Sequence, residues 1–398
     1  MKSFLNKIKI KISEYGFWNA SKLFFISIKD RLLIYFKHAI YRRKNPIQKD
    51  AKIAFIVDYL APASQRYRVD NIIEYLQLAG IKSSKINIKE LVKYSESVCK
   101  AKIIIFFRIP LTKEIKVFLK QSQKKQTTKI YSCDDLIFDP NNFLKKYNLN
   151  NNIKNYDRQK TKQFYDLFKK CDYFLSSTEY LANRAEKLGK KAFVIPNALN
   201  QKQIDIYQDI LKKPERKSNK IILGYFSGTK THDADFDLIS PILIQILKKY
   251  PKVNLFLMGH LSIDEKLQKY KKQIIRQKIV HWTKLPYFIN KVDINLVPLV
   301  NNQLNQGKSE LKYFEAGILK IPTITSPIES FKKAIQNGEN GFIAESKYDW
   351  EKYLKLLIDN KKLRQKIGAN AYYDIIKNYS PKVLSNKTIQ VLKIQKNN

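Results

Sequence analysis

The sequence is poor in cysteine and lacks any long apolar run. Its three cysteines, Cys99, Cys133 and Cys171, lie far apart and without the spacing of metal ligands. This excludes a disulfide framework and a zinc motif, and it favours reduced thiols in a cytoplasmic protein. No apolar stretch approaches the roughly 20 residues that span a bilayer, and no small-residue cleavage site follows a short apolar core. We therefore expect neither a membrane-spanning helix nor a signal peptide.

Acidic residues are also scarce relative to basic ones. Lys and Arg number 75 against 35 Asp and Glu, which gives a net charge of +40 over 398 residues. A field of this size attracts phosphate-bearing substrates, anionic lipid or nucleic acid. The lysines are dispersed, however, and no recognisable nucleic-acid-binding module is present, so we expect no nucleic-acid partner. With 44% hydrophobic and 12% aromatic residues, the chain can bury a large core in two domains.

Basic and aromatic residues are interleaved near the N-terminus. Residues 1 to 50 hold twelve basic and three acidic side chains, a net charge of +9, among apolar residues such as Phe17, Trp18 and Phe36. This basic amphipathic pattern predicts a helical extension over residues 1–47. Such an extension either contacts the anionic inner face of the plasma membrane or packs as a helical pair on the main domain.

From Lys52 onward, short apolar runs alternate with amphipathic helices. Ile53–Val57 is wholly apolar, and the helical pattern that follows, from Tyr67 to Leu78, ends before Gly80. Such alternation predicts a parallel sheet with helices on both faces. Further strands are expected at 103–107, 130–132, 173–176 and 192–195, and then at 221–226, 254–258, 278–281, 294–297, 323–325 and 341–343.

A lysine-rich connector at 212–220 divides this pattern into two doubly wound units. We expect an N-terminal domain over residues 48–212, completed by C-terminal helices over 375–398, and a C-terminal domain over 213–374. In such folds ligands bind beyond the carboxyl ends of the strands. The loops that follow the apolar runs are therefore where functional residues are expected.

Two of these loops in the first half carry charged residues. Ser64, Arg66 and Arg68 open a helix whose N-terminus favours anions, with solvation at the surface as the alternative. Asp134 and Asp135 follow a short apolar run. Their crowding suggests ligand binding or catalysis, with helix capping as the alternative for either one.

The second half contributes a hydroxyl-rich loop and an unusually placed glutamate. An apolar strand is followed by Ser227-Gly228-Thr229-Lys230-Thr231-His232, whose backbone N–H groups and cations suit a diphosphate. Glu315 lies beside the apolar face of a helix predicted between Gly307 and Pro322, so its carboxylate must be paired or used by a ligand. Lys312, one turn earlier, is the alternative partner.

Taken in order, these segments resemble bacterial glycosyltransferases of family 4 and its relatives. The resemblance rests on Asp172 with residues 177–181, 194–198, 224–236, 258–259 and 308–322, and it covers the chain from about Lys52 to Tyr379. It implies the GT-B fold, an α/β architecture in which two Rossmann-like domains face each other across a cleft. It also implies transfer of a sugar from a UDP-, GDP- or dTDP-linked donor with retention at the anomeric carbon, without a metal or a prosthetic group.

The resemblance also implies roles for individual residues. Glu315 matches the second glutamate of the family's Glu-x7-Glu motif, which binds the donor ribose hydroxyls. Asp134 and Asp135 would face the transferred sugar or the acceptor. The other donor-binding residues are expected to be Ser227, Gly228, Thr229, Lys230, His232, Lys308, Ser309 and Leu311, and the acceptor side to include Ser64, Arg66 and Arg68.

Three departures from the family pattern accompany these matches. Gly307 stands where the first glutamate of the motif is expected, and no histidine occurs between His38 and His232, where many members place one opposite the sugar. The arginine that usually binds the diphosphate is also absent, so Lys230, His232 or Lys308 must supply its charge. These departures concern the identity of the sugar more than the class of reaction.

We therefore expect a glycosyltransferase acting on a glycan or lipid-linked acceptor, in the synthesis of bacterial surface polysaccharide or lipopolysaccharide. It would be cytoplasmic or peripheral on the inner membrane face. A sugar-nucleotide epimerase on the same architecture is one alternative and would convert the donor without an acceptor. A non-enzymatic basic protein that binds membrane or nucleic acid is the other.

Overall fold

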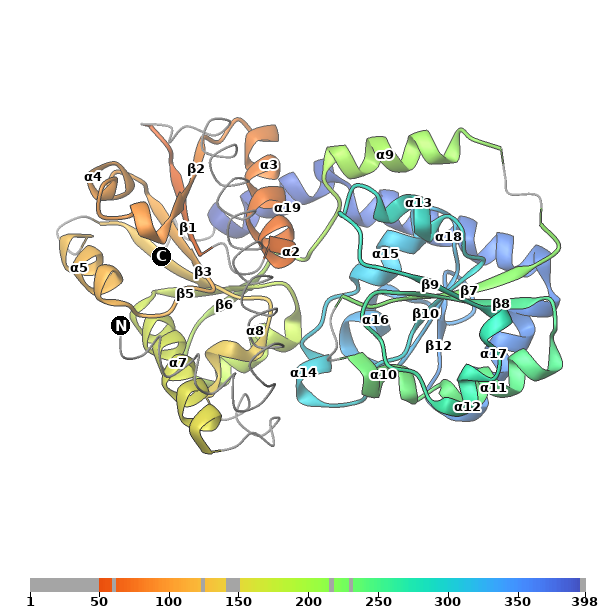
Figure 1. The fold of residues 1–398 in the computed structure, drawn as a ribbon. Helices are drawn as coiled ribbons and strands as arrows, with labels where there is room; N and C mark the ends of the chain where they lie inside the picture. Colours follow the sequence, from red (N-terminus) through yellow and green to blue (C-terminus); the bar gives the residue numbers. More distant parts are fainter. Residues whose placement is uncertain are drawn as a thin grey trace. The chain divides into compact units, whose positions relative to one another are not determined.

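The computed structural model describes residues 50–58, 62–122, 126–140, 151–214, 218–228 and 232–393 of the chain. Two parallel sheets, both within the unit Asp50–Asn398, organise this part of the protein (Figure 1). The expected extension over residues 1–47 lies outside the described residues, as do Thr229 and Lys230. Within the described ranges, no helix is long and apolar enough to cross a membrane.

The first sheet has six parallel strands in the order β2-β1-β3-β4-β5-β6. Every residue of β1 is buried, as expected for a strand of a parallel sheet covered on both faces. The sequence pattern did not predict β2, because this edge strand, Ser-Ser-Lys-Ile-Asn, contains no apolar run. The strands are β1 (Ile53–Val57), β2 (Ser83–Asn87), β3 (Ile103–Phe107), β4 (Thr128–Ser132), β5 (Tyr173–Ser176) and β6 (Ala192–Val194).

The second sheet repeats this design in the order β12-β11-β10-β7-β8-β9. One expected strand was wrong: the sequence placed it at 278–281, whereas β9 ends at Gln277. As an edge strand, β9 is partly exposed and includes Arg276, so apolar content did not mark its position. The strands are β7 (Ile221–Phe226), β8 (Val253–Met258), β9 (Ile274–Gln277), β10 (Ile294–Val297), β11 (Thr323–Thr325) and β12 (Phe342–Ile343).

Helices connect the strands throughout. In the first half they are α2 (Pro62–Gln65), a π-helical turn (Arg66–Asp70), α3 (Asn71–Leu78), α4 (Ser95–Val98), α5 (Lys113–Ser122), α7 (Asn151–Lys170), α8 (Glu179–Lys187) and α9 (Gln201–Leu211), with 3-10 turns at Ile88–Glu90 and Leu136–Phe138. In the second half they are α10 (Asp233–Asp237), α11 (Ser240–Lys249), α12 (Glu265–Gln268), α13 (Leu285–Ile289), α14 (Gln303–Gln306), α15 (Leu311–Gly317), α16 (Glu329–Ala334), α17 (Lys347–Asp359), α18 (Lys361–Tyr379) and α19 (Pro381–Lys393), with a 3-10 turn at Lys271–Gln273.

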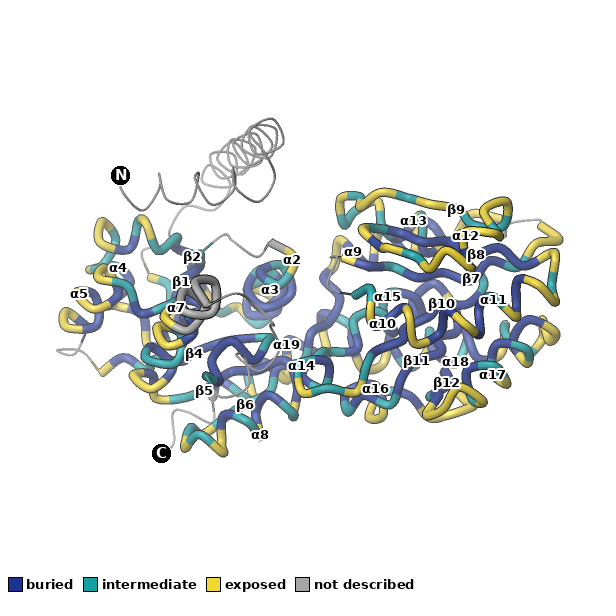
Figure 2. The backbone as a smooth tube through the Cα atoms, turned by 60° about the horizontal axis from the view of Figure 1, so that its bottom comes forward, coloured by how far each residue is buried: buried dark blue, intermediate teal, exposed yellow. Residues whose placement is uncertain are grey.

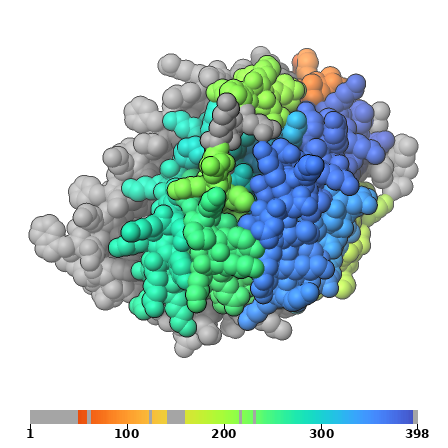
Figure 3. Space-filling model, turned by 90° about the vertical axis from the view of Figure 1, so that its right-hand side faces the viewer, coloured from red at the N-terminus to blue at the C-terminus, as the bar shows by residue number. Residues whose placement is uncertain are grey.

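The last two helices join the two halves of the molecule. α18 packs closely on α15 at Gly317, where a Cβ atom would lie 2.3 Å from Ile375 Cδ1 and would push that side chain aside. α19 packs on α3, where the Ser385 hydroxyl donates a hydrogen bond to the Tyr75 carbonyl oxygen at 2.7 Å. α17 also packs on α11, and the blue C-terminal helices lie beside green segments on the face shown in Figure 3.

The buried side chains form continuous cores under this framework. Figure 2 shows the central strands almost entirely buried, while the helices alternate buried and exposed residues. One core runs from Phe55 and Ile72 through Phe314 to Ile375, and therefore includes side chains from both halves of the chain. The predicted class, an α/β protein with two doubly wound parallel sheets, is confirmed, while the expected domain limits stay predictions.

Candidate active site

The carboxyl ends of β7 and β8 bring the hydroxyl-rich loop against a glycine. The Ser227 backbone N–H donates to the Met258 carbonyl oxygen at 2.9 Å, and Ser227 is buried while Gly228 is exposed. Gly259 has a φ of +99°, and a Cβ atom there would lie 2.0 Å from the Ser227 carbonyl oxygen. Only glycine tolerates both conditions. The neighbouring Thr229 and Lys230 lie outside the described residues.

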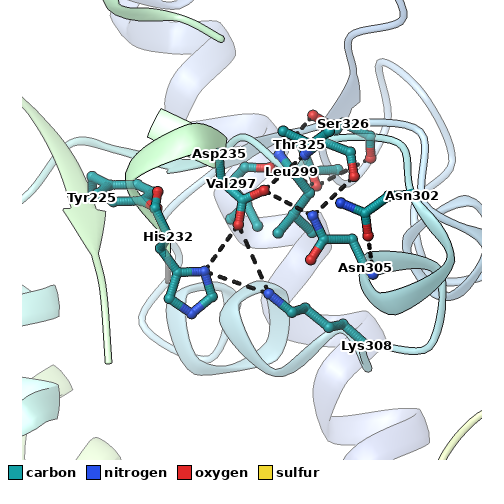
Figure 4. A network of polar contacts seen from close by, with 11 residues as sticks. Tyr225, His232, Asp235, Val297, Leu299, Asn302, Asn305, Lys308, Thr325 and Ser326 are labelled. Atoms are coloured by element: carbon teal, nitrogen blue, oxygen red, sulfur yellow. Dashed lines mark hydrogen bonds and ion pairs between the residues drawn. The ribbon is translucent and has the colours of Figure 1, made fainter. Parts of the chain in front are cut away.

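Asp235, a buried residue of α10, contacts both His232 and Lys308 at this edge of the sheet. The Asp235 Oδ2 atom lies 2.9 Å from His232 Nδ1 and 3.8 Å from Lys308 Nζ, and Figure 4 shows both side chains directed at this carboxylate. Its other oxygen, Oδ1, accepts hydrogen bonds from the Val300 N–H at 2.9 Å and from the Asn305 amide at 2.8 Å. Asp235 thereby links α10 to the loop that carries Lys308.

The ionisation of this group follows from its contacts. Although burial raises the pKa of Asp235, the hydrogen bonds from His232 and Val300 and the charge of Lys308 outweigh it and lower the pKa. For His232, the Asp235 hydrogen bond raises the pKa, but burial and the charges of Lys312 and Lys308 lower it below the ordinary value. The imidazole is therefore neutral at pH 7, and the positive charge at this edge belongs to the lysines.

Lys312 is the most unusual of these cations. Its Nζ atom is shut off from solvent and has no hydrogen-bond partner among the described residues. It lies 4.8 Å from the centre of the Tyr225 ring, a cation–π contact. Burial and the charge of Lys308 lower the pKa of Lys312 to about 8. A buried ammonium without a hydrogen bond is costly, so the position favours an anionic ligand.

Glu315 lies one helical turn after Lys312 on α15. Its Oε1 atom accepts a hydrogen bond from the Tyr67 hydroxyl at 2.5 Å and lies 3.9 Å from the Arg66 guanidinium. Burial raises the pKa of Glu315, and the charges of Arg66 and Lys312 and the Tyr67 hydrogen bond oppose this rise. Both of these contacts use Oε1, and Oε2 is proposed to serve a ligand hydroxyl. We call His232, Asp235, Lys308, Lys312 and Glu315 the second-sheet cluster.

Arg66 faces this cluster rather than open solvent. Its guanidinium carbon lies 4.4 Å from the centre of the Tyr67 ring and 4.7 Å from that of Trp282. The rings hold the guanidinium near Glu315 without neutralising it. The structure thus places Arg66, expected on the acceptor side, beside the residue expected to bind the donor.

A second group of charges forms at the carboxyl ends of β3 and β4. Arg108 donates from NH1 to Asp134 Oδ1 at 3.1 Å and to the Ser64 hydroxyl at 3.3 Å, and its NH2 lies 4.0 Å from Asp135 Oδ2. Arg108 has a φ of +50°, the left-handed region that a non-glycine residue adopts only under constraint. Ser64, Arg108, Asp134 and Asp135 form what we call the first-sheet cluster.

The two aspartates of this cluster have different surroundings. Asp135 accepts a hydrogen bond from the Leu136 N–H at 2.8 Å, which caps the following 3-10 turn, and 44% of its side chain is exposed. Partial burial raises the pKa of Asp135, and the charge of Asp134 raises it further. The charges of Arg108 and Lys308 oppose this rise. The charge of Lys308, a member of the second-sheet cluster, therefore acts on Asp135 in the first-sheet cluster.

Arg68 has a structural position. Its side chain is fully buried, its NH1 donates to the Ile195 carbonyl oxygen, and its NH2 donates to the Ser176 carbonyl oxygen at 2.8 Å. Burial lowers the pKa of Arg68 to about 10. These bonds fix the ends of β5 and β6, so in this structure the guanidinium is not available to an acceptor.

The remaining expected donor residues surround the start of α15. The Ser309 hydroxyl accepts a hydrogen bond from the Asn197 amide at 2.8 Å, which ties this segment to the loop after β6. Leu311 is half-buried against the core. At Gly307, where the first glutamate of the family motif is missing, a Cβ atom would lie 3.1 Å from Leu181 Cδ2. A leucine of α8 thus occupies the space next to this position.

Sequence reasoning missed three residues that the structure brings to these clusters, Tyr67, Arg108 and Asp235, and it considered Lys312 only as a partner of Glu315. Arg108 carried a signal, since it directly follows the wholly apolar β3. Lys312 also carried one, because it shares a helix face with Glu315. Within the described ranges, no group of three or more His, Cys, Asp or Glu side chains could hold a metal ion.

Part of the chain matches a known protein family, and its fold matches solved structures. Residues 241–386 match the family model described as glycosyl transferase-like. No curated protein sequence gives a match. Among solved structures, sucrose-phosphate synthase from Thermosynechococcus elongatus has a TM-score of 0.60 at 12% identity, over 87% of this chain and 99% of that one.

Two further structures give similar values. A glycosyltransferase from Rickettsia africae has a TM-score of 0.60 at 14% identity, over 88% of this chain and 100% of that chain. HepE from Anabaena, in complex with UDP and glucose, has a TM-score of 0.57 at 13% identity, over 86% and 99% of the two chains. The shared architecture confirms the predicted GT-B fold, and residues 241–386 match a glycosyl transferase-like family model.

Proposed function

We propose that the protein transfers a sugar from a nucleotide-sugar donor to a glycan or lipid-linked acceptor, with retention at the anomeric carbon. The observation that carries the proposal is the pairing of Glu315 with Lys312 on one helical turn. Glu315 offers a carboxylate whose side chain is 12% exposed, and Lys312 a buried ammonium without a hydrogen-bond partner among the described residues. A ribose diol followed by a diphosphate presents the complementary groups in the same order.

The donor would bind along the second-sheet cluster. Glu315 would accept hydrogen bonds from the ribose hydroxyls, while Lys312 and Lys308 would bind the phosphates. Ser227 and Gly228 are proposed to contribute backbone N–H groups, together with Thr229 and Lys230 of the same loop. HepE, which shares the fold, has been crystallised with UDP, and this supports a nucleotide donor.

The chemical step develops negative charge on the leaving diphosphate and positive charge on the sugar. The two clusters are proposed to stabilise these two charges. Departure of the nucleoside diphosphate develops negative charge on the phosphates, which Lys312 and Lys308 would stabilise. The sugar becomes oxocarbenium-like and positive, and Asp134 or Asp135 would face it. Arg108 would position these aspartates, and Ser64 would lie on the acceptor side. Arg68 is left out of this site because its guanidinium is buried and bonded.

The basic, aromatic N-terminal residues support a proposal about where in the cell the protein acts. Residues 1 to 50 carry a net charge of +9 among aromatic side chains, which suits a peripheral contact with anionic lipid. An acceptor built on a lipid carrier would lie at such a surface. We therefore place the reaction in the synthesis of bacterial surface polysaccharide or lipopolysaccharide, on the inner face of the membrane.

Proton NMR of donor turnover tests the proposal. The protein is incubated with UDP-, GDP- and dTDP-sugars in turn, and the earliest sugar released to water or to an added glycan is assigned as α or β. One donor should lose its sugar with the configuration retained, and Glu315→Ala should abolish this turnover. An inverted product would contradict retention, and an epimerised donor with the nucleotide still attached would favour an epimerase.

A further inference from the structure

A hollow separate from both clusters lies behind the segment that carries Lys308. Its volume is about 290 Å³, close to the lower limit for small-ligand pockets. Four parts of the chain line it: the start of α8 with Ser177, the end of β6 with Val194, the residues around α15 and α16 with Glu310, and the junction of α18 and α19 with Asn378 and Lys387. None of these residues has a role in the proposed transfer.

A wall of backbone divides this hollow from the second-sheet cluster. The Ser330 hydroxyl donates to the Lys308 carbonyl oxygen at 2.6 Å, and the Thr178 hydroxyl donates to the Gly307 carbonyl oxygen at 3.4 Å. Both hydroxyls belong to residues that line the hollow. The Lys308 side chain lies instead near Asp235, 3.8 Å from its carboxylate. The hollow is therefore a distinct site that shares one wall with the donor site.

Two buried polar groups in the hollow have unused hydrogen-bonding capacity. Ser177 is 3% exposed, and its hydroxyl has no hydrogen-bond partner among the described residues. Glu310 is 8% exposed, and its carboxylate accepts hydrogen bonds from the Tyr379 hydroxyl at 2.8 Å and from its own backbone N–H. A carboxylate can accept about four hydrogen bonds, and buried polar groups are normally satisfied. The site therefore favours a ligand that offers several hydroxyl donors.

The charges around the hollow are mixed and largely compensated. Lys333 lies 3.0 Å from Glu329 in an ion pair, and Lys387 acts on Glu310 with the opposite charge. Val194 and Val383 add small apolar surfaces among these polar groups. A strongly charged ligand would find as much repulsion as attraction here. A neutral ring that carries both hydroxyl groups and C–H faces fits this lining.

We propose that this hollow binds one sugar unit of a glycan, apart from the unit that reacts. The inference goes beyond the proposed transfer and does not depend on Glu315 or Lys312. Glu310 and Ser177 would bond the sugar hydroxyls from one side, and Asn378 and Lys387 from the other. Because Ser330 and Thr178 hold the carbonyl groups of residues 307–308, a bound sugar would also stiffen the segment that carries Lys308.

Saturation-transfer NMR tests the site with methyl glycosides of glucose, galactose, mannose and N-acetylglucosamine, and with a disaccharide of each. The wild-type chain should bind at least one of them, and Lys387→Ala and Ser177→Val should each weaken this binding by about tenfold, the cost of one lost charge-assisted bond or of a blocked pocket. Lys382→Ala removes an exposed lysine from the same helix and should leave binding unchanged.

Glu315→Ala separates this site from the donor site, because it should abolish nucleotide binding and leave glycoside binding intact. Tighter binding of a disaccharide than of its methyl glycoside would support a glycan ligand. The proposal is overturned if no glycoside binds the folded wild-type chain. It is also overturned if Glu315→Ala removes glycoside binding while Lys387→Ala and Ser177→Val retain it, since the sugars would then occupy the donor site.

Discussion

The first-sheet and second-sheet clusters differ in how far their charges are already compensated. In the first-sheet cluster, Arg108 is shared between Asp134 and Asp135, and a strained backbone holds it in place. In the second-sheet cluster, Lys312 has no hydrogen-bond partner among the described residues, and the contacts of Glu315 with Tyr67 and Arg66 use the same oxygen. The first cluster is preorganised, whereas the second retains capacity for a ligand.

This difference suggests a division of labour. A preorganised group of charges stabilises a transition state without reorganising, so the first-sheet cluster suits the developing positive charge on a sugar. A group with unused ammonium and carboxylate functions suits binding of a substrate that brings phosphate and hydroxyl groups. Changes in the first cluster should therefore affect turnover, and changes in the second should affect donor affinity.

The largest effect is expected from Arg108→Asn. Asparagine tolerates the left-handed backbone conformation at this position, so the variant removes the guanidinium with little added strain. Without it, Asp134 and Asp135 repel each other and lose their orientation, and kcat should fall about 100-fold. Nucleotide affinity measured by calorimetry should stay within about twofold. A matching loss of affinity would show that the clusters do not divide the work.

Lys312→Met should lower donor affinity by about 10- to 100-fold, the range for a lost charge-assisted hydrogen bond. It should also raise the melting temperature, because the buried ammonium is replaced by an apolar side chain of similar length. Lys362→Met, at an exposed position on α18, is the control and should change neither quantity. Reduced affinity accompanied by a lower melting temperature would instead indicate damage to the fold.

The pH dependence of donor binding should report Lys312 directly. Its pKa is lowered to about 8 in the folded protein, so the ammonium is mostly protonated at pH 7 and mostly neutral at pH 9. Affinity for a nucleotide-sugar should therefore fall about tenfold over this interval. The Lys312→Met variant should show a flat profile. A wild-type profile that is equally flat would contradict the role of this lysine.

The same pKa sets a stability effect of opposite direction. The pKa of Lys312 is below its ordinary value of 10.5, so between about pH 8 and 10.5 the unfolded chain binds more protons than the folded one. The contribution of this group to stability therefore rises with pH across that window. Urea denaturation of wild type and Lys312→Met at both ends of the window should show a larger rise in the wild type, since Lys85, whose pKa is also lowered, contributes equally to both.

The smallest effect is expected from Tyr67→Phe, which removes the hydrogen bond that the hydroxyl donates to Glu315 Oε1 and the one that it accepts from the Gln203 amide at 3.1 Å. The free energy of unfolding should fall by about 2 kcal/mol, the net value of two such bonds. Tyr75→Phe is a matched control, since its hydroxyl donates to the Leu199 carbonyl oxygen at 2.9 Å, away from both clusters. Donor affinity should respond to Tyr67→Phe and not to Tyr75→Phe.

The sequence predicted the central strands well because a strand that is buried on both faces consists of consecutive apolar residues. β1 and β3 are nearly continuous apolar runs, and they were predicted at the residues where they occur. β2 and β9 were missed or misplaced because edge strands need less burial and include polar residues. Apolar content therefore identifies the middle of a parallel sheet better than its margins.

The site was predictable to a similar degree. Position in a motif made Glu315 a candidate, and position after a strand made Asp134 and Asp135 candidates; their roles stay predictions. Arg66 and Arg68 looked equivalent in sequence, yet Arg68 is fully buried and bonds backbone carbonyl groups, while Arg66 reaches toward Glu315. Tertiary packing, here against the ends of β5 and β6, decides which of the two neighbouring side chains turns inward. The local sequence does not carry this information.

Calorimetric titration of UDP, GDP and dTDP into wild type, Glu315→Gln and Asp135→Asn tests whether Glu315 binds the donor while Asp135 does not. Both variants keep the shape of the side chain and remove its charge. The nucleotide that binds the wild type should bind Glu315→Gln about tenfold or more weakly, and Asp135→Asn with affinity within about twofold of the wild type. Undiminished binding by Glu315→Gln, or an equal loss in both variants, would contradict the account.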